Sequence, residues 1–297
     1  MAKIGLIDVD GHNFPNLCLM KISAHHKRQG DSVEWWNGFE HYDTVYKSRV
    51  FDDTYSTEDH TVINADVIIR GGTGYGLDNK LADEIEHIYP DYNLYPQFNG
   101  AYGFLTRGCP RNCPFCIVSE KEGRISRKVA DLSEFWQEQK TIKLLDPNLL
   151  ACKDHENLLQ QLVSSGARVD FTQGLDARML CRDNIGLLQK VKTKMVHFAW
   201  DGEKDSDIII GNLQKYKRIT GVDRRKAAVY VLTNYNTDFE FDLYRVNTLR
   251  EIGYDPYVMV YDKQTAPRKV RLLQRWVNNR RIWATIDRFE DYDSKIG

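Results

Sequence analysis

The sequence has no long apolar run and almost no net charge. No stretch of about 18 apolar residues occurs in its 297 residues, so we expect no transmembrane helix. The 41 basic and 42 acidic side chains nearly cancel, which leaves no overall field to favour nucleic acid or a membrane surface. The apolar part of residues 1–8 is too short for a signal peptide and is typical of a strand. We therefore expect a cytoplasmic protein without membrane association.

Cysteine is also scarce, and half of it is concentrated in one place. Three of the six cysteines have the spacing Cys109-x3-Cys113-x2-Cys116, and no fourth lies close by. Clustering of this kind in a chain of this length indicates a reducing compartment. Thiolates select iron–sulfur clusters, zinc or copper(I), and a structural zinc or ferredoxin-type site needs a fourth ligand from the chain. Three thiolates on a four-iron cluster would leave one iron open to a small molecule.

Two other interpretations of these cysteines remain open. One is a zinc knuckle that a distant histidine completes, and the other is a redox pair of Cys113 and Cys116. The redox pair leaves Cys109 without a role. The zinc knuckle leaves unexplained the regular alternation of strands and helices in the rest of the chain. We therefore favour the cluster.

Strand-like and helix-like segments alternate along the chain, which predicts an α/β protein. Residues 1–90 form the first expected domain, a Rossmann-like (flavodoxin-like) layer with strands at 3–9, 32–36, 43–51 and 66–70 and helices at 16–29 and about 80–88. Residues 89–99 are interpreted as a connection. The second domain, 91–297, has expected strands at 101–105, 142–145, 168–172, 195–200, 227–232 and 257–261. Its expected helices lie near 131–140, 155–165, 183–191, 205–217, 238–252 and 268–279.

The cysteine spacing, with Thr106-Arg107-Gly108 before it and Phe115 beside the last cysteine, resembles the radical S-adenosylmethionine (SAM) superfamily. The closest likeness is to the subgroup whose barrel follows a cobalamin-binding-like domain. The resemblance implies that the second domain is a partial (β/α)6 barrel in which Cys109, Cys113 and Cys116 hold a 4Fe–4S cluster. SAM would bind the open iron, and an electron from the cluster would cleave it to a 5′-deoxyadenosyl radical. A reductant such as flavodoxin or ferredoxin is the implied partner.

The resemblance also implies SAM contacts at the carboxyl ends of the barrel strands, where such barrels gather their chemistry. Leu145-Asp146-Pro147-Asn148-Leu149 resembles the family segment near the methionine end of SAM, which makes Asp146 and Asn148 candidates. Arg178 is the candidate for the SAM carboxylate. Asp201 belongs to residues 198–202, which occupy the place of the family segment that lies near the SAM ribose. A zwitterion needs one cation for its carboxylate and one acceptor for its ammonium group. The alternative for Asp201 is a helix N-cap.

Two features of the first domain bear on cobalamin. Asp10-x-His12 matches part of the cobalamin-binding motif of the resembled subgroup, with Pro15 where that motif has glycine. His12 is either the lower cobalt ligand, which would allow methyl transfer, or a loop histidine that caps the following helix. The turn Gly71 to Gly76 is either a phosphate cradle or a tight turn at a domain contact.

The C-terminal stretch 268–288 combines seven basic residues with Trp276 and Trp283. Arginine beside tryptophan could clamp nucleic acid, while an amphipathic helix that packs its tryptophans on the barrel is the simpler interpretation. We expect a small-molecule or peptide substrate rather than nucleic acid. The alternative function is a non-enzymatic iron–sulfur or zinc module, with nucleic acid as its partner.

Overall fold

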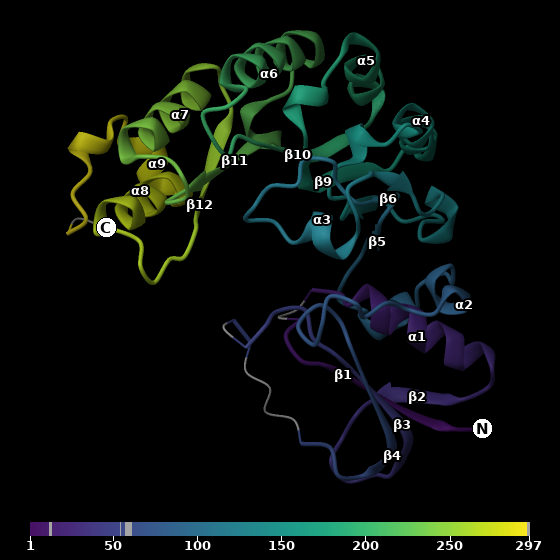
Figure 1. The fold of residues 1–297 in the computed structure, drawn as a ribbon. Helices are drawn as coiled ribbons and strands as arrows, with labels where there is room; N and C mark the ends of the chain where they lie inside the picture. Colours follow the sequence, from purple (N-terminus) through teal and green to yellow (C-terminus); the bar gives the residue numbers. More distant parts are fainter. Residues whose placement is uncertain (12–13, 54, 57–60, 296–297) are drawn as a thin grey trace.

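The computed structural model describes residues 1–297 apart from 12–13, 54, 57–60 and 296–297 (Figure 1). It is an α/β protein with two parallel sheets, one of four strands near the N-terminus and one of six strands after it. The predicted fold class is confirmed at this level. The six-stranded sheet is open, because its two edge strands, β5 and β12, do not pair with each other in the described part of the chain.

The four-stranded sheet has the order β2-β1-β3-β4, with all neighbours parallel. The expected strands and the first helix are confirmed, but the helix expected at 80–88 is reduced to a single turn. The elements are β1 (Lys3–Asp8), α1 (Leu17–Arg28), β2 (Ser32–Trp35), β3 (Tyr42–Ser48), β4 (Ala65–Gly71) and α2 (Asp83–Glu86). Asn16 caps α1 by accepting from the Leu19 N–H.

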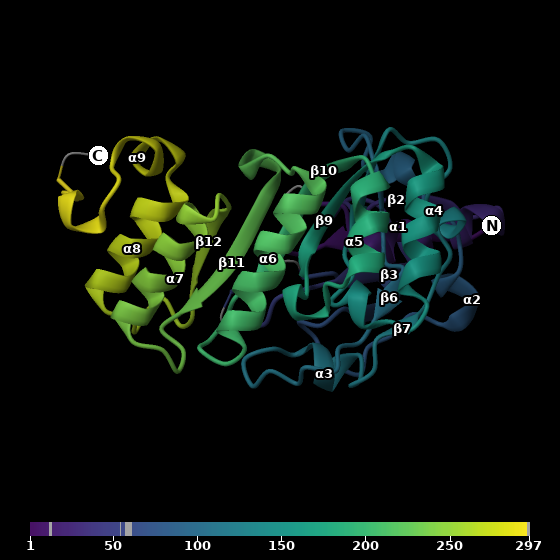
Figure 2. The same ribbon diagram turned by 90° about the horizontal axis from the view of Figure 1, so that it is seen from above.

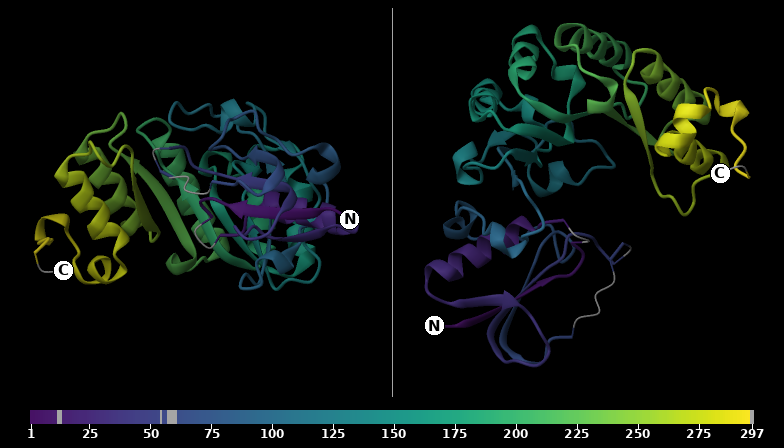
Figure 3. Two further views of the ribbon diagram at one scale, coloured as in Figure 1. Left: turned by 90° about the horizontal axis from the view of Figure 1, so that it is seen from below. Right: turned by 180° about the vertical axis from the view of Figure 1, so that it is seen from behind.

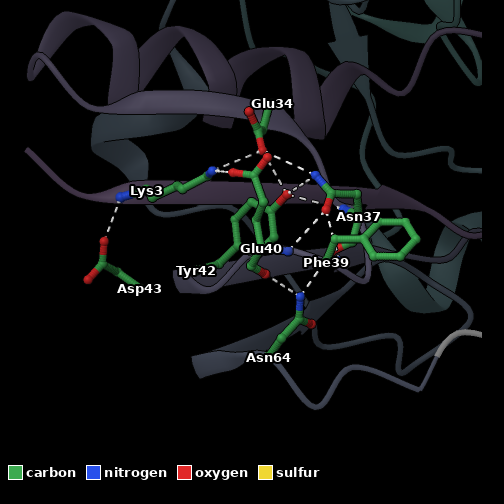
Figure 4. A network of polar contacts seen from close by, with 8 residues as sticks. All are labelled: Lys3, Glu34, Asn37, Phe39, Glu40, Tyr42, Asp43 and Asn64. Atoms are coloured by element: carbon green, nitrogen blue, oxygen red, sulfur yellow. Dashed lines mark hydrogen bonds and ion pairs between the residues drawn. The ribbon is translucent and has the colours of Figure 1, made fainter.

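The connection from β2 to β3 is short and is held by polar side chains (Figure 4). Asn37 accepts from the backbone N–H groups of Phe39 and Glu40 and donates to the Tyr42 hydroxyl. Asn64, immediately before β4, donates to the Asn37 carbonyl at 2.9 Å. The start of β4 is therefore tied to this loop, and no helix intervenes between β2 and β3.

The six-stranded sheet has its strands in consecutive order, β12-β11-β10-β9-β8-β5, all parallel. Right-handed crossovers between adjacent parallel strands place the helices on one face, and Figure 2 shows α4 to α7 on that face. The elements are β5 (Ala101–Gly103), β8 (Thr141–Leu144), α4 (His155–Ser165), β9 (Arg168–Leu175), α5 (Arg182–Lys190), β10 (Thr193–Ala199), α6 (Ser206–Thr220), β11 (Ala227–Thr233), α7 (Phe239–Glu251), β12 (Asp255–Val260), α8 (Arg268–Asn278) and α9 (Arg280–Thr285).

The helix expected at 131–140 is wrong. This segment has only a 3-10 turn at Leu132–Glu134, and its residues bond outward instead of continuing a helix. The Phe135 carbonyl accepts from the Tyr92 hydroxyl, and the Phe135 ring is so close to Gly103 that a Cβ there would lie 2.5 Å from it. Tertiary contacts of Phe135 with the connection and with β5 therefore override the local helical pattern.

The connection between the sheets contacts both of them (Figure 3). In addition to the Tyr92 bond, the Tyr95 hydroxyl donates to Asp8 at the end of β1 at 2.7 Å. At the other end of the chain, Trp276 and Trp283 are buried, with ring centroids 4.8 Å apart. These tryptophans are therefore not available to stack on nucleic acid bases, and the packing interpretation of 268–288 is confirmed. None of the helices in the described residues is long and apolar enough to span a membrane.

Candidate metal centre

The three clustered cysteines lie on a loop whose base is closed by a short ribbon. β6 (Thr106–Arg107) pairs antiparallel with β7 (Arg127–Lys128), and the loop between them includes the one-turn helix α3 (Val118–Lys121). Gly108 has φ +89°, and a Cβ there would lie 2.2 Å from the Ile125 carbonyl oxygen. The Cys109 N–H donates to the Gly123 carbonyl at 3.1 Å. Glycine at 108 is therefore required for the close approach that fixes the first cysteine.

The thiols of Cys109, Cys113 and Cys116 are free and share one electrostatic environment. Burial raises the pKa of Cys113, and the charges of Asp201 and of the other two thiolates raise it further. Burial also raises the pKa of Cys116, to which Cys109 and Asp201 again contribute. Three thiolates in this loop would repel one another, so a positively charged group would be needed to keep them deprotonated together.

Asn148 joins the cysteine loop to the second strand of the sheet. Its side-chain amide donates to Cys109 Sγ at 3.4 Å and approaches Asp176 at 3.4 Å. Asn148 is buried, and its Oδ1 has no hydrogen-bond partner in the described part of the molecule. A buried acceptor without a partner is costly, so this oxygen is suited to accept from a donor group of a ligand.

Asp176, at the end of β9, organises the cations beside the cysteines. It accepts from Arg178 Nε at 2.7 Å and forms an ion pair with Arg111 of the cysteine loop. Burial alone would raise the pKa of Asp176, but the hydrogen bonds and charges of Arg178 and Arg111 outweigh burial and lower it. Asp176 therefore stays ionised and fixes one arginine from the cysteine loop and one from the turn that follows β9.

Asp201 follows β10 and lies on the same side of the sheet as the cysteines. Burial raises its pKa, and the nearby charges of Arg245 and Arg178 partly offset that effect. It does not cap α6, because the residue at the N-cap position is Asp205. The N-cap alternative for Asp201 is therefore wrong.

Asp146 lies below the loop rather than beside the thiols. Both of its carboxylate oxygens accept from the Leu105 N–H, at 3.2 and 3.3 Å, and one also accepts from the N–H and hydroxyl of Thr106. Burial raises its pKa to about 6. Its side chain fixes the entry of the cysteine loop, so among the predicted SAM contacts the structure groups Asn148, Arg178 and Asp201 with the cysteines and places Asp146 in a supporting position.

Aromatic contacts that no sequence motif predicted link the loop to the far half of the sheet. Phe115 packs edge-to-face on Tyr235, with ring centroids 5.2 Å apart, and Tyr235 packs in the same way on Tyr261 at 4.8 Å. Tyr235 and Tyr261 follow β11 and β12. The cysteine loop therefore reaches across the carboxyl edge of the sheet to its last two strands.

The face of the sheet opposite the helices has polar and aromatic side chains that the sequence analysis also missed. His197 of β10 stacks on Tyr230 of β11 with 5.0 Å between ring centroids, and its Nδ1 lies 2.9 Å from the Phe171 carbonyl. Burial raises the pKa of Tyr230 to about 12, with smaller contributions from Asp170 and Tyr257. His197 and Tyr230 are each partly exposed and lie between two buried neighbours in β10 and β11.

Polar groups at the carboxyl edge of the four-stranded sheet are largely satisfied within the protein. Asn16 donates to Asp8 and to the Ser48 hydroxyl, and Asp10 accepts from the backbone of Val50 and Phe51. His12, the predicted cobalt ligand, lies outside the described residues. The structure thus leaves the cobalamin prediction untested.

The turn Gly71 to Gly76 packs on the backbone next to it. A Cβ on Gly72 or Gly74 would lie 2.2 Å from the carbonyl oxygen of Arg49 or Phe51. Thr73 in this turn accepts from Lys121 of α3, so the turn also contacts the cysteine loop. These contacts favour the tight turn at a domain contact over the phosphate cradle.

Thiols are the donors that iron–sulfur clusters use, and the cysteine loop supplies three of them. No three His, Cys, Asp or Glu side chains in the described ranges are grouped to hold one metal ion. The loop instead offers three thiols within electrostatic reach of one another and an amide that donates to one sulfur, which are the ligand type and outer contact that such clusters use. No protein-family model matches this sequence, and no curated protein matches it.

Proposed function

We propose that this chain is a radical SAM enzyme that holds one 4Fe–4S cluster on Cys109, Cys113 and Cys116. One observation supports this proposal above the others. The cysteine loop follows the first strand of a consecutive parallel sheet, and Asn148, Arg178 and Asp201 approach it from the ends of the next three strands. When bound, the cluster supplies the electron that cleaves SAM to methionine and a 5′-deoxyadenosyl radical.

The side chains beside the thiols suit a zwitterionic ligand. Asn148 Oδ1 is a buried acceptor without a partner, and we assign it to the ammonium group of SAM. Arg178 is held by Asp176 through Nε and lies 3.7 Å from Asp205 through Nη1, which orients its guanidinium for the carboxylate. Asp201 remains the candidate for the ribose hydroxyls. The substrate would then face the surface of His197 and Tyr230, which suits a small molecule or a peptide.

The first experiment is anaerobic reconstitution with iron and sulfide, followed by reduction in the presence of SAM. We expect about four irons per chain and formation of 5′-deoxyadenosine. Cys113→Ala should lose both. Cys181→Ala, which removes an exposed thiol at the start of α5, is the matched control and should keep both.

The same reconstitution experiment distinguishes the enzyme from the alternative function, a non-enzymatic metal-binding module. A reconstituted cluster that never cleaves SAM would contradict the enzyme and favour the non-enzymatic iron–sulfur module. A colourless protein with one tightly bound zinc would favour the zinc module. Cobalamin remains a prediction, tested by its retention on gel filtration with His12→Ala as control; without retention, the methyl-transfer version is withdrawn.

A further inference from the structure

β4 is the edge strand of the four-stranded sheet. It pairs with β3 on one side, and no other described strand pairs with it on the other side. Figure 1 shows β4 at the bottom of the N-terminal sheet, on the side away from the six-stranded sheet. A seven-residue edge of this kind offers unpaired backbone groups to another strand, and proteins usually protect such edges with charged side chains, proline or a bulge.

β4 has two charged side chains, Asp66 and Arg70, and exposes apolar side chains between them. Its sequence, Ala-Asp-Val-Ile-Ile-Arg-Gly, contains neither lysine nor proline. Val67 is 49% exposed and Ile69 is 43% exposed, although both belong to a sheet. They lie on the same face of the strand because side chains alternate. An apolar edge left exposed in this way is typical of a strand that pairs with a partner.

The charges of β4 identify that partner as a second copy of the same strand. In an antiparallel pair centred on Ile68, Asp66 of one copy lies opposite Arg70 of the other, and Val67 lies opposite Ile69. A two-fold axis makes both ion pairs at once. A shift of the register by two residues removes both pairs, and a parallel pairing places Asp66 opposite Asp66, which is repulsive. Asp66 also lies 3.2 Å from His41 in its own chain, at an exposed position.

The backbone of β4 is oriented for the same register. The Arg49 N–H donates to the Gly71 carbonyl at 3.0 Å, and the pairing of β3 with β4 is unbroken from Thr44 to Ser48. Backbone groups alternate in direction along a strand, so Ile69 and Gly71 face β3 while Ile68 and Arg70 face the free edge. Residues that face the edge are those that exchange two hydrogen bonds with the residue opposite. Ile68 is therefore oriented to bond to Ile68 of the second copy.

We propose that two copies of this chain associate through β4 in this antiparallel register and form one continuous sheet. The pairing uses residues 66–70 of β4, and none of the residues assigned to the candidate metal centre belongs to that strand. The inference does not depend on the proposed function, and either can fail without the other.

The first test measures mass by light scattering over a series of concentrations of the purified chain. We expect a species of twice the 34.6 kDa chain mass that dissociates on dilution. Asp66→Arg alone and Arg70→Asp alone should each raise the dimer dissociation constant at least about tenfold, because like charges then face each other. The double variant Asp66→Arg/Arg70→Asp should restore it. Glu251→Arg, an equal change of charge at an exposed site on α7, should leave it unchanged.

A second test fixes the register even if the charge variants fold poorly. Ile68→Cys should form a disulfide between two copies under mild oxidation, since opposite residues of a hydrogen-bonded antiparallel pair lie about 5.5 Å apart between Cα atoms. Val67→Cys and the wild-type chain are the controls and should form little crosslinked dimer. A monomer at every concentration, a dimer that none of the charge variants weakens, or equal crosslinking of Ile68→Cys and Val67→Cys would each overturn the proposal.

Discussion

Arg245 is a fully buried charge beside the six-stranded sheet, and its replacement tests how the end of this sheet is held. Its side chain is 0% exposed and forms an ion pair with Asp242, which is 1% exposed. It also donates to the Leu232 carbonyl at 2.7 Å and to the Trp200 carbonyl. Arg245 therefore joins the ends of β10 and β11 next to Asp201 in the chain.

Arg245→Met removes the cation and leaves Asp242 buried without its counter-charge, with the Thr237 hydroxyl as its one remaining side-chain donor among the described residues. Breaking a buried pair in this way costs about 3–5 kcal/mol. In the double variant Asp242→Asn/Arg245→Met no charge is left unpaired, so most of the loss should be recovered. The native pair is itself incompletely satisfied, because Arg245 Nε and Asp242 Oδ2 have no partner within the described residues.

The assay is urea denaturation followed by circular dichroism, with linear extrapolation to water. Arg225→Met is the matched control, because Arg225 pairs with Asp223 on the surface and its loss should leave the free energy of unfolding nearly unchanged. A loss of less than about 1 kcal/mol for Arg245→Met would refute the reasoning. A double variant as unstable as the single one would show that the lost carbonyl contacts, not the unpaired charge, set the cost.

Two further predictions concern the cysteine loop. The pKa of Asp146 is raised from 3.8 to about 6, so the folded chain binds a proton on Asp146 more tightly than the unfolded chain does. Protonated Asp146 therefore contributes to the free energy of unfolding below pH 4, and this contribution is lost as the pH rises through 6. Between those pH values the wild type should lose roughly 1.4 kcal/mol of stability per unit of pKa shift relative to Asp146→Asn, and parallel stability curves from urea titrations would contradict this. Gly108→Ala should destabilise the loop by about 1–3 kcal/mol and reduce the iron retained after reconstitution, because of its φ of +89° and the close Ile125 carbonyl. Gly186→Ala, within α5 and with open space around it, should not.

Much of the architecture could be predicted from the sequence because it depends on local patterns. Strand-like segments predicted every strand of both sheets, and glycine at 166 ends α4 in the left-handed conformation, as a helix stop requires. The same reasoning failed at 131–140, where the local pattern is helical. There Phe135 packs against Gly103 and its carbonyl binds Tyr92, so distant contacts outweigh propensity.

The candidate site, too, could be predicted from the sequence only in part. The spacing of three cysteines is a property of the chain alone, and it predicted which side chains share a loop. Which groups come to that loop was decided by the fold: Asp146 supports it from below, while Phe115 reaches Tyr235 more than a hundred residues later. The self-complementary charges of β4 were present in the sequence from the start. Only the strand order showed that β4 is an edge, because pairing partners are set by the tertiary arrangement and not by the strand's own residues.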